Sequence, residues 1–249
     1  MTAWFLAWGR TARFAVVVSA AALSPSSYTP RSRTMIAKQL YFTAWQVVPG
    51  FALFAALLGA VVIDIIVSVA RQFGLAQYAL ELVFRALVLE MLPLVTALFL
   101  ALRSGAAINT EIALMRVAGE LDGVRSGVEA FEREFVPRLA AAAISVMSLT
   151  LFACALALLI AYAVMYGFSP WGFAEYTRVV GLVFSPAVLA GLALKCLLFG
   201  VAIAVIPIAA GLDATRQMKS APVAVMGGMV RLFFTLALIE VFALAVKYV

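Results

Sequence analysis

Histidine is absent from this chain of 249 residues, and only 12% of its residues are charged. The absence of histidine excludes Ser-His and Cys-His catalytic pairs, and it removes the most common protein ligand of transition metals. The sequence also lacks a G-x-x-x-x-G-K-[ST] motif, so the chain cannot bind ATP through a P-loop. Because there is no paired-acid motif either, an enzyme acting on lipids inside the membrane is a weak hypothesis. We predict no catalytic residue, cofactor site or metal site in this chain.

Hydrophobic residues, in contrast, make up 66% of the chain, and its mean hydropathy is +1.11. Soluble domains contain about 45–50% apolar and about 25% charged residues. The two cysteines, Cys154 and Cys196, both lie in apolar runs, where free cysteine acts as a packing residue. The composition therefore predicts an all-α integral membrane protein. The net charge of +6 reflects membrane orientation rather than nucleic-acid binding, because the basic residues are not clustered with aromatic ones.

Five apolar runs are candidates for transmembrane helices, each of which needs about 20 residues. The runs are Val47–Ala70, Ala79–Leu102, Leu139–Tyr166, Val179–Ala210 and Leu232–Val246. The fourth is longer than one crossing requires, and Pro186 indicates where its membrane helix begins. The last is short and contains Glu240, so it crosses the membrane only if helix packing shelters that carboxylate.

Basic residues are distributed unequally between the two sides of these predicted spans. Most of them precede the first span, separate the second from the third, or separate the fourth from the fifth. The opposite side contains only Arg71, Arg178 and Lys247 outside the apolar runs. The positive-inside rule then places the N-terminus in the cytoplasm and the C-terminus on the periplasmic side, and five spans agree with this orientation.

Residues 1–46 are predicted to form a separate N-terminal region of cytoplasmic or interfacial helices, before a membrane domain over residues 47–249. The stretch RTARFAVVVSAAALS has the basic start, short apolar run and small residues of a signal peptide, which would be cleaved. The alternative is a helix lying in the membrane interface. The following SPSSYTPRS breaks the chain, and Met35–Val48 reads as a second interfacial helix anchored by Trp45.

Residues 111–135 carry an apolar stripe at helical spacing, typical of an amphipathic helix. The stripe consists of Leu114, Val117, Leu121, Val124, Val128, Phe131 and Phe135. Gly119, Gly123 and Gly127 recur within it, either to let another backbone approach or to break the helix in two, and we favour the break. Because the polar face mixes acids and bases, docking on a protein is favoured over lying on the lipid surface.

The stretch EMLPLVTALFLALRSGAAINTEIALMRVAGEL resembles the signature of the MlaE/YrbE permease family. Glu90 and Pro93 match the opening of that signature, and further matches are Arg103, Gly105, Ala107, Glu111, Met115 and Arg116. Downstream, LALKCLLFG and AAGLDA resemble two more family stretches, with Gly211 and Asp213 matching in the second. The resemblance covers residues 39–246. Leu92 and Leu102 replace family glycines, and FEREFVP replaces the usual turn after the cytoplasmic helix.

This resemblance implies the membrane subunit of an ABC transporter in the bacterial inner membrane, moving phospholipid or a related lipid between that membrane and the outer envelope. It implies a separate ATPase subunit on the cytoplasmic side, which binds the ATP, and an Mce-domain protein on the periplasmic side. It also implies a permease dimer, with identical or different chains. The helix after Arg103 would be the coupling helix that docks on the ATPase, through Glu111, Met115, Arg116, Leu121 and Val124. A non-transporting partner subunit or scaffold in such a complex is the alternative function.

Charged residues inside the predicted spans form the second candidate site. Glu90, Lys195 and Glu240 lie within spans two, four and five. An ionised side chain at the bilayer centre costs at least about 2.5–3.5 kcal/mol unless it is paired or hydrated. We hypothesise that Lys195 pairs with Glu240, with Glu90 and Arg103 close by; the alternative is that each charge reaches water separately. Such a network could brace a gate or only fix helix register.

Overall fold

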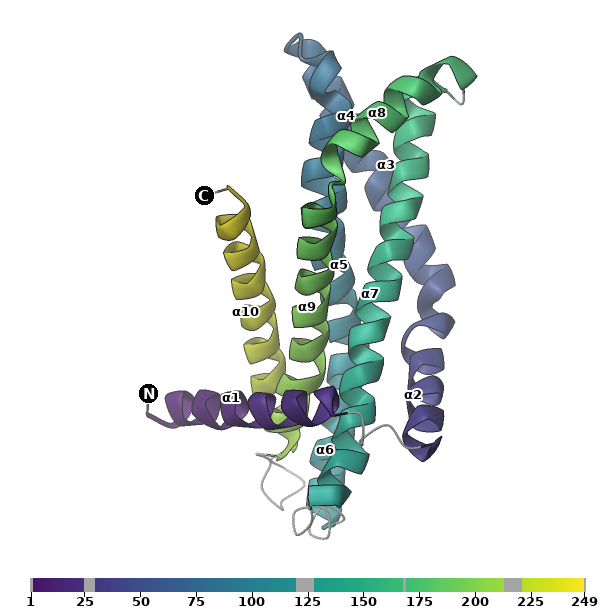
Figure 1. The fold of residues 1–249 in the computed structure, drawn as a ribbon. Coiled ribbons are helices and arrows are strands. Elements are labelled where there is room, and N and C mark those ends of the chain that lie inside the picture. The colour runs from purple at the N-terminus through teal and green to yellow at the C-terminus, as the bar shows by residue number, and fades with distance from the viewer. Residues whose placement is uncertain (1, 25–29, 120–127, 168, 213–220, 249) are drawn as a thin grey trace.

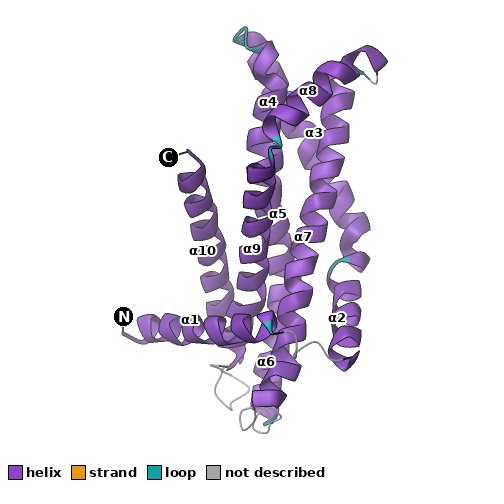
Figure 2. Ribbon diagram, viewed as in Figure 1, coloured by secondary structure: helices purple, strands orange, loops and turns teal. Residues whose placement is uncertain are grey.

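The computed structural model describes residues 2–24, 30–119, 128–167, 169–212 and 221–248, and every regular element in these ranges is helical (Figure 2). Five of the helices in this described part are long and apolar enough to cross a membrane. They cover Ser32–Gln72, Ala76–Ala118, Phe135–Tyr166, Pro186–Leu212 and Val225–Lys247. The prediction of an all-α membrane protein with five spans is therefore confirmed.

The second span is one continuous helix built from regular and wide turns. It runs through α4 (Ala79–Leu82), a π-helical segment (Val83–Met91), α5 (Leu92–Leu100), a second π-helical segment (Ala101–Gly105) and α6 (Ala106–Ala118). Where the first π-helical segment meets α5, the Leu92 N–H donates a hydrogen bond to the carbonyl of Leu87, five residues back. Pro93 follows in the first turn of α5, where it has no N–H to donate. The wide turn absorbs the break in the hydrogen-bond ladder, so the helix continues past the predicted end at Leu102.

The third and fourth spans pack tightly at the centre of the bundle. α7 (Val128–Tyr166) continues through Pro137, and α9 (Pro186–Leu212) continues through Pro207. A Cβ added to Gly200 of α9 would collide with the backbone of Ala143 on α7, so these helices approach each other more closely than a side chain would permit. Glycine is the residue that allows this approach.

The fourth span begins at Pro186, as predicted, but the preceding residues are not part of it. They form a separate short helix, α8 (Phe173–Val183), at one end of the bundle (Figure 1). The apolar run that begins at Val179 therefore includes the end of α8 as well as the fourth span. Hydropathy alone could not separate the two, because Val179 and Val183 are both apolar and both buried.

Two N-terminal helices precede the third, α3 (Val48–Gln72), and they differ in direction. α1 (Thr2–Leu23) runs across the end of the bundle opposite α8, whereas α2 (Pro30–Thr43) runs alongside α7 (Figure 1). α1 ends and α2 begins on either side of the predicted break, but the predicted helix over Met35–Val48 is displaced toward the N-terminus, because α2 begins at Pro30 and ends at Thr43. A short 3₁₀ turn, Trp45–Val47, joins α2 to α3, and Trp45 is exposed.

Residues of α1 complete a hydrophobic cluster at this end of the bundle. Val18 is fully buried there, and the rings of Phe14 and Phe135 pack edge to face with centroids 5.8 Å apart. The other buried members are Ile108, Ile112, Leu139, Ala142, Ala204, Val205 and Ile208. α1 is therefore part of the folded core rather than an appendage to it.

Candidate functional site: a charged cavity between spans

Lys195 is the centre of a cluster of charged side chains from three spans. It lies on α9, and its Nζ is 2.6 Å from Glu90 Oε2 of the π-helical segment and 2.8 Å from Glu240 Oε2 of α10 (Ala221–Tyr248). Nζ also donates to the Leu89 carbonyl at 3.4 Å. The side chain of Lys195 is only 5% exposed, so its charge is compensated by these oxygens rather than by solvent.

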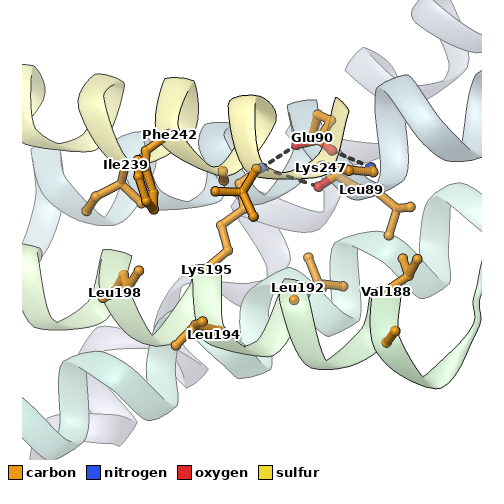
Figure 3. A pocket seen from close by; sticks show the side chains of 14 residues that line it. Leu89, Glu90, Val188, Leu192, Leu194, Lys195, Leu198, Ile239, Phe242 and Lys247 are labelled. Atoms are coloured by element: carbon orange, nitrogen blue, oxygen red, sulfur yellow. Dashed lines mark hydrogen bonds and ion pairs between the residues drawn. The ribbon is translucent and has the colours of Figure 1, made fainter. Parts of the chain in front are cut away.

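Sequence reasoning missed a further member of this cluster. Lys247, in the last turn of α10, places Nζ 2.5 Å from Glu90 Oε1, so the Glu90 carboxylate bridges two ammonium groups (Figure 3). Two lysines and two glutamates leave the cluster neutral overall. The spacing could have revealed it, because Lys247 follows Glu240 by seven residues and therefore lies two turns further on the same helix face.

The structure does not bring Arg103 into this cluster, in contrast to the sequence hypothesis. Arg103 is exposed in the second π-helical segment, and its Nη2 donates to Gln46 Oε1 at 3.3 Å. Thirteen residues separate it from Glu90, which is about 20 Å along a helix. Both residues belong to one continuous helix, which keeps Arg103 apart from Glu90.

The charged cluster forms part of the wall of a cavity of about 430 Å³ between α9 and α10. Lys195, Glu90 and Lys247 contribute to the wall, and the rest is almost entirely apolar (Figure 3). The apolar lining comes from Leu89, Ala187, Val188, Gly191, Leu192, Leu194, Leu198, Ile239, Phe242, Ala243 and Val246. The volume falls within the roughly 300–1,000 Å³ of small-molecule sites. A cavity with an apolar lining and charges on one wall suits an amphiphile.

The position of α10 explains why the cavity exists. Near its start, α10 packs against α6 and α9, where a Cβ on Gly228 would collide with Ala210 and with the side chain of Asn109. Gly105 of the second span also allows α10 to approach closely, because a Cβ at this position would lie 3.0 Å from the Leu232 side chain of α10. Toward the C-terminus α10 diverges from α9 (Figure 1), and the cavity occupies the space between them. The motif residue Gly105 thus helps to close the narrow end.

Residues predicted for the coupling helix lie at the opposite end of the second span. Glu111, Met115 and Arg116 are on α6, and Arg138 Nη2 of α7 donates to Glu111 Oε1 at 3.0 Å. Gly119 ends α6 in a left-handed conformation with φ of 80°, so the predicted break at this glycine is confirmed. Leu121, Val124 and the motif residue Asp213 lie outside the described residues.

The apolar stripe predicted for this region differs from the surface that α6 buries. The buried residues of α6 are Ile108, Asn109, Ile112 and Ala113, which face α9 and α10. Leu114, the first residue of the predicted stripe, is 48% exposed. Leu114 therefore lies outside the surface that α6 uses for packing within the chain. Pro93, the other matched motif residue, is buried in α5.

Two comparisons with known proteins gave different results. A search of curated proteins finds no match, whereas a family model does. The family model described as Permease MlaE matches residues 36–246, which include the three middle spans in full, most of the first and last spans, and the Glu90, Lys195 and Glu240 side chains. α1 and Lys247 lie outside the matched stretch. Since the match covers most of the sequence, this chain belongs to the MlaE permease family.

Proposed function

We propose that this chain is the transmembrane subunit of an ABC-type lipid transporter, moving phospholipid or a related lipid between the bacterial inner membrane and the outer envelope. The observation that carries the proposal is the cavity of about 430 Å³ between α9 and α10, with its apolar lining and charged wall. An apolar lining matches acyl chains, and the charges of Glu90, Lys195 and Lys247 match a polar headgroup.

The energy for transport comes from a separate ATPase subunit in this proposal, since the chain has no P-loop. The exposed face of α6 near Gly119 is the docking site, with Leu114 as an apolar contact. The mixed charges of Glu111 and Arg116 suit a protein partner better than a lipid surface. Met115 and the predicted contacts Leu121 and Val124 complete the proposed coupling region.

The orientation follows from the distribution of basic residues. The end of the bundle with α1 and α6 is cytoplasmic, and the end with α8 is periplasmic, as the positive-inside rule requires. An Mce-domain protein would then contact the periplasmic end, where the cavity between α9 and α10 lies. A dimer of permease chains, identical or different, completes the transporter.

Lipid bound to the purified chain tests the proposal. Gly191 lines the cavity, and a Cβ added there meets no atom within 4 Å, so Gly191→Leu is expected to fill the cavity without disturbing the helices. Mass spectrometry should detect phospholipid retained by the parent protein and lost from Gly191→Leu. Gly50→Leu on α3 is the matched control, because Gly50 also has open space around it and lies outside the cavity. Equal retention by both variants, or none by the parent, contradicts the proposal.

Docking of the ATPase is tested at Leu114. Co-purification of an ATPase with the tagged chain is expected, and Leu114→Asp should reduce it by removing an exposed apolar contact. The same change at Leu182 of α8, which is 58% exposed at the opposite end of the bundle, is the control (Figure 1). Loss of the ATPase from the Leu182 variant alone would reverse the assigned orientation.

A further inference from the structure

We propose that the cavity selects a zwitterionic phospholipid with a primary ammonium group, and that this headgroup replaces the Lys247–Glu90 ion pair. In the bound state Lys247 contacts the lipid phosphate, and Glu90 contacts the lipid ammonium. The inference rests on the proposed function and adds to it the residues that recognise the headgroup.

The Lys247–Glu90 pair is positioned where a headgroup must enter. Both residues line the cavity, and they connect the last turn of α10 to the second span (Figure 3). The side chain of Lys247 is 24% exposed, compared with 5% for Lys195. Acyl chains in the apolar part of the cavity would bring the phosphate to this charged wall.

Lys247 is the cation that can change partners, because it is more exposed to solvent than Lys195. Lys195 reaches Glu90, Glu240 and the Leu89 carbonyl from the middle of α9. Lys247 lies in the last turn of α10, where a helix frays more easily than in its middle.

Charge balance determines the class of headgroup. The closed cluster contains two ammonium groups and two carboxylates, and its net charge is zero. A headgroup with only a phosphate would add an uncompensated negative charge to a largely desolvated site, which is unfavourable. A zwitterionic headgroup adds one negative and one positive charge, so the cluster remains neutral after the exchange.

Hydrogen bonding distinguishes between zwitterionic headgroups. When Lys247 leaves, Glu90 Oε1 loses its ammonium donor. A primary ammonium on the lipid has three N–H donors, as a lysine ammonium does, and can replace it. A quaternary ammonium has no N–H and leaves the oxygen without a donor. The geometry therefore favours an ethanolamine headgroup over a choline or a glycerol headgroup.

Competition among lipids tests this inference. The full chain is incubated with vesicles containing equal amounts of phosphatidylethanolamine, phosphatidylcholine and phosphatidylglycerol, and the bound lipid is measured by mass spectrometry. We expect the parent protein to enrich phosphatidylethanolamine about tenfold, the effect of one hydrogen bond between charged groups. Lys247→Met should lose this enrichment and still bind lipid, whereas Lys247→Arg should retain it. Lys38→Met, which removes an exposed charge on α2, is the matched control.

Glu90→Gln provides the most specific outcome. Without this carboxylate the cluster has an excess positive charge, so an anionic headgroup restores neutrality, and the preference should change to phosphatidylglycerol. Lipid binding by the parent without headgroup preference, or full enrichment by Lys247→Met, overturns the inference and leaves the proposed function standing. Absence of bound lipid from the parent overturns the proposed function itself.

Discussion

Replacing Lys195 by methionine should strongly destabilise the protein. The substitution keeps the length and apolar stem of the side chain but removes the ammonium that contacts Glu90 at 2.6 Å and Glu240 at 2.8 Å. Glu90 keeps Lys247 as a partner, whereas Glu240, whose side chain is 10% exposed, loses the cation that the structure places beside it. Breaking a buried pair on one side costs about 3–5 kcal/mol.

Thermal unfolding of the purified protein in detergent measures this cost. For a chain of this size 1 kcal/mol corresponds to about 2–4 °C, so Lys195→Met should lower the melting temperature by about 6–20 °C. The double variant Lys195→Met, Glu240→Met should recover most of the lost melting temperature. It removes both charges of the Lys195–Glu240 pair and leaves Glu90 paired with Lys247. Lys195→Met combined with Glu90→Gln should recover less, because Glu240 then remains buried without its cation.

Exchanging the charges of Lys195 and Glu240 is a poorer test. The new carboxylate at position 195 would face Glu90, so the exchange should fail even though the pair is real. The reasoning is refuted if Lys195→Met melts within about 2 °C of the parent, a difference below 1 kcal/mol. It is also refuted if the two double variants show the same stability.

Three further predictions follow from other parts of the fold. Gly200→Ala should lower stability by about 1–3 kcal/mol in the same thermal assay, because its Cβ would collide with the Ala143 backbone, whereas Gly191→Ala, with nothing within 4 Å, should be nearly neutral. Tyr176, on α8 outside the spans, donates a hydrogen bond from its hydroxyl to the Leu158 carbonyl, and burial raises the pKa of that hydroxyl to about 12. Its contribution to the stability of the fold should therefore be present below pH 10 and lost as the pH rises toward 12. In an ultraviolet titration, the Tyr176→Phe variant should lack one tyrosine that ionises late in the parent protein. Intact-mass measurement of the membrane-extracted protein should show that α1 is retained, since Val18 is fully buried in the core; a mass corresponding to a chain without α1 would contradict this.

Much of the fold could be predicted from the sequence because membrane spans depend on local composition. Apolar runs of sufficient length located all five spans, and Pro186 located the beginning of the fourth. Glu240 was expected to be sheltered if the last run crossed the membrane, and it is 8% exposed. These predictions followed from one physical fact, the free-energy cost of placing a charge or an unpaired backbone polar group in lipid.

The boundaries of the helices were less predictable because they depend on neighbouring elements. The second span was expected to end at Leu102, yet Ile108 and Ile112 continue it by packing against α9 and α10. Polar residues such as Asn109 obscured this, since a buried asparagine that donates to the Val225 carbonyl is not visible in a hydropathy pattern. A tertiary contact decided where the helix ended.

The candidate site was predicted in part, and both errors have a geometric cause. Arg103 was expected close to the charged cluster, although a helix separates it from Glu90 by about 20 Å. Lys247 was counted as a residue of the outer loop because it follows the apolar run. Its spacing of seven residues from Glu240 places it on the same face of α10, but its contact with Glu90 also depends on how α10 approaches the second span.

The uninterrupted second helix has a mechanical consequence. Between Leu114 and Glu90 it extends over 24 residues, roughly 36 Å. A rod of that length behaves as a lever: tilting its α6 end by about 5° would displace the far carboxylate by about 3 Å over this span. Such a displacement exceeds the tolerance of a hydrogen bond, so a small tilt of α6 would be enough to separate Glu90 from its lysine partners and open the cavity beside them.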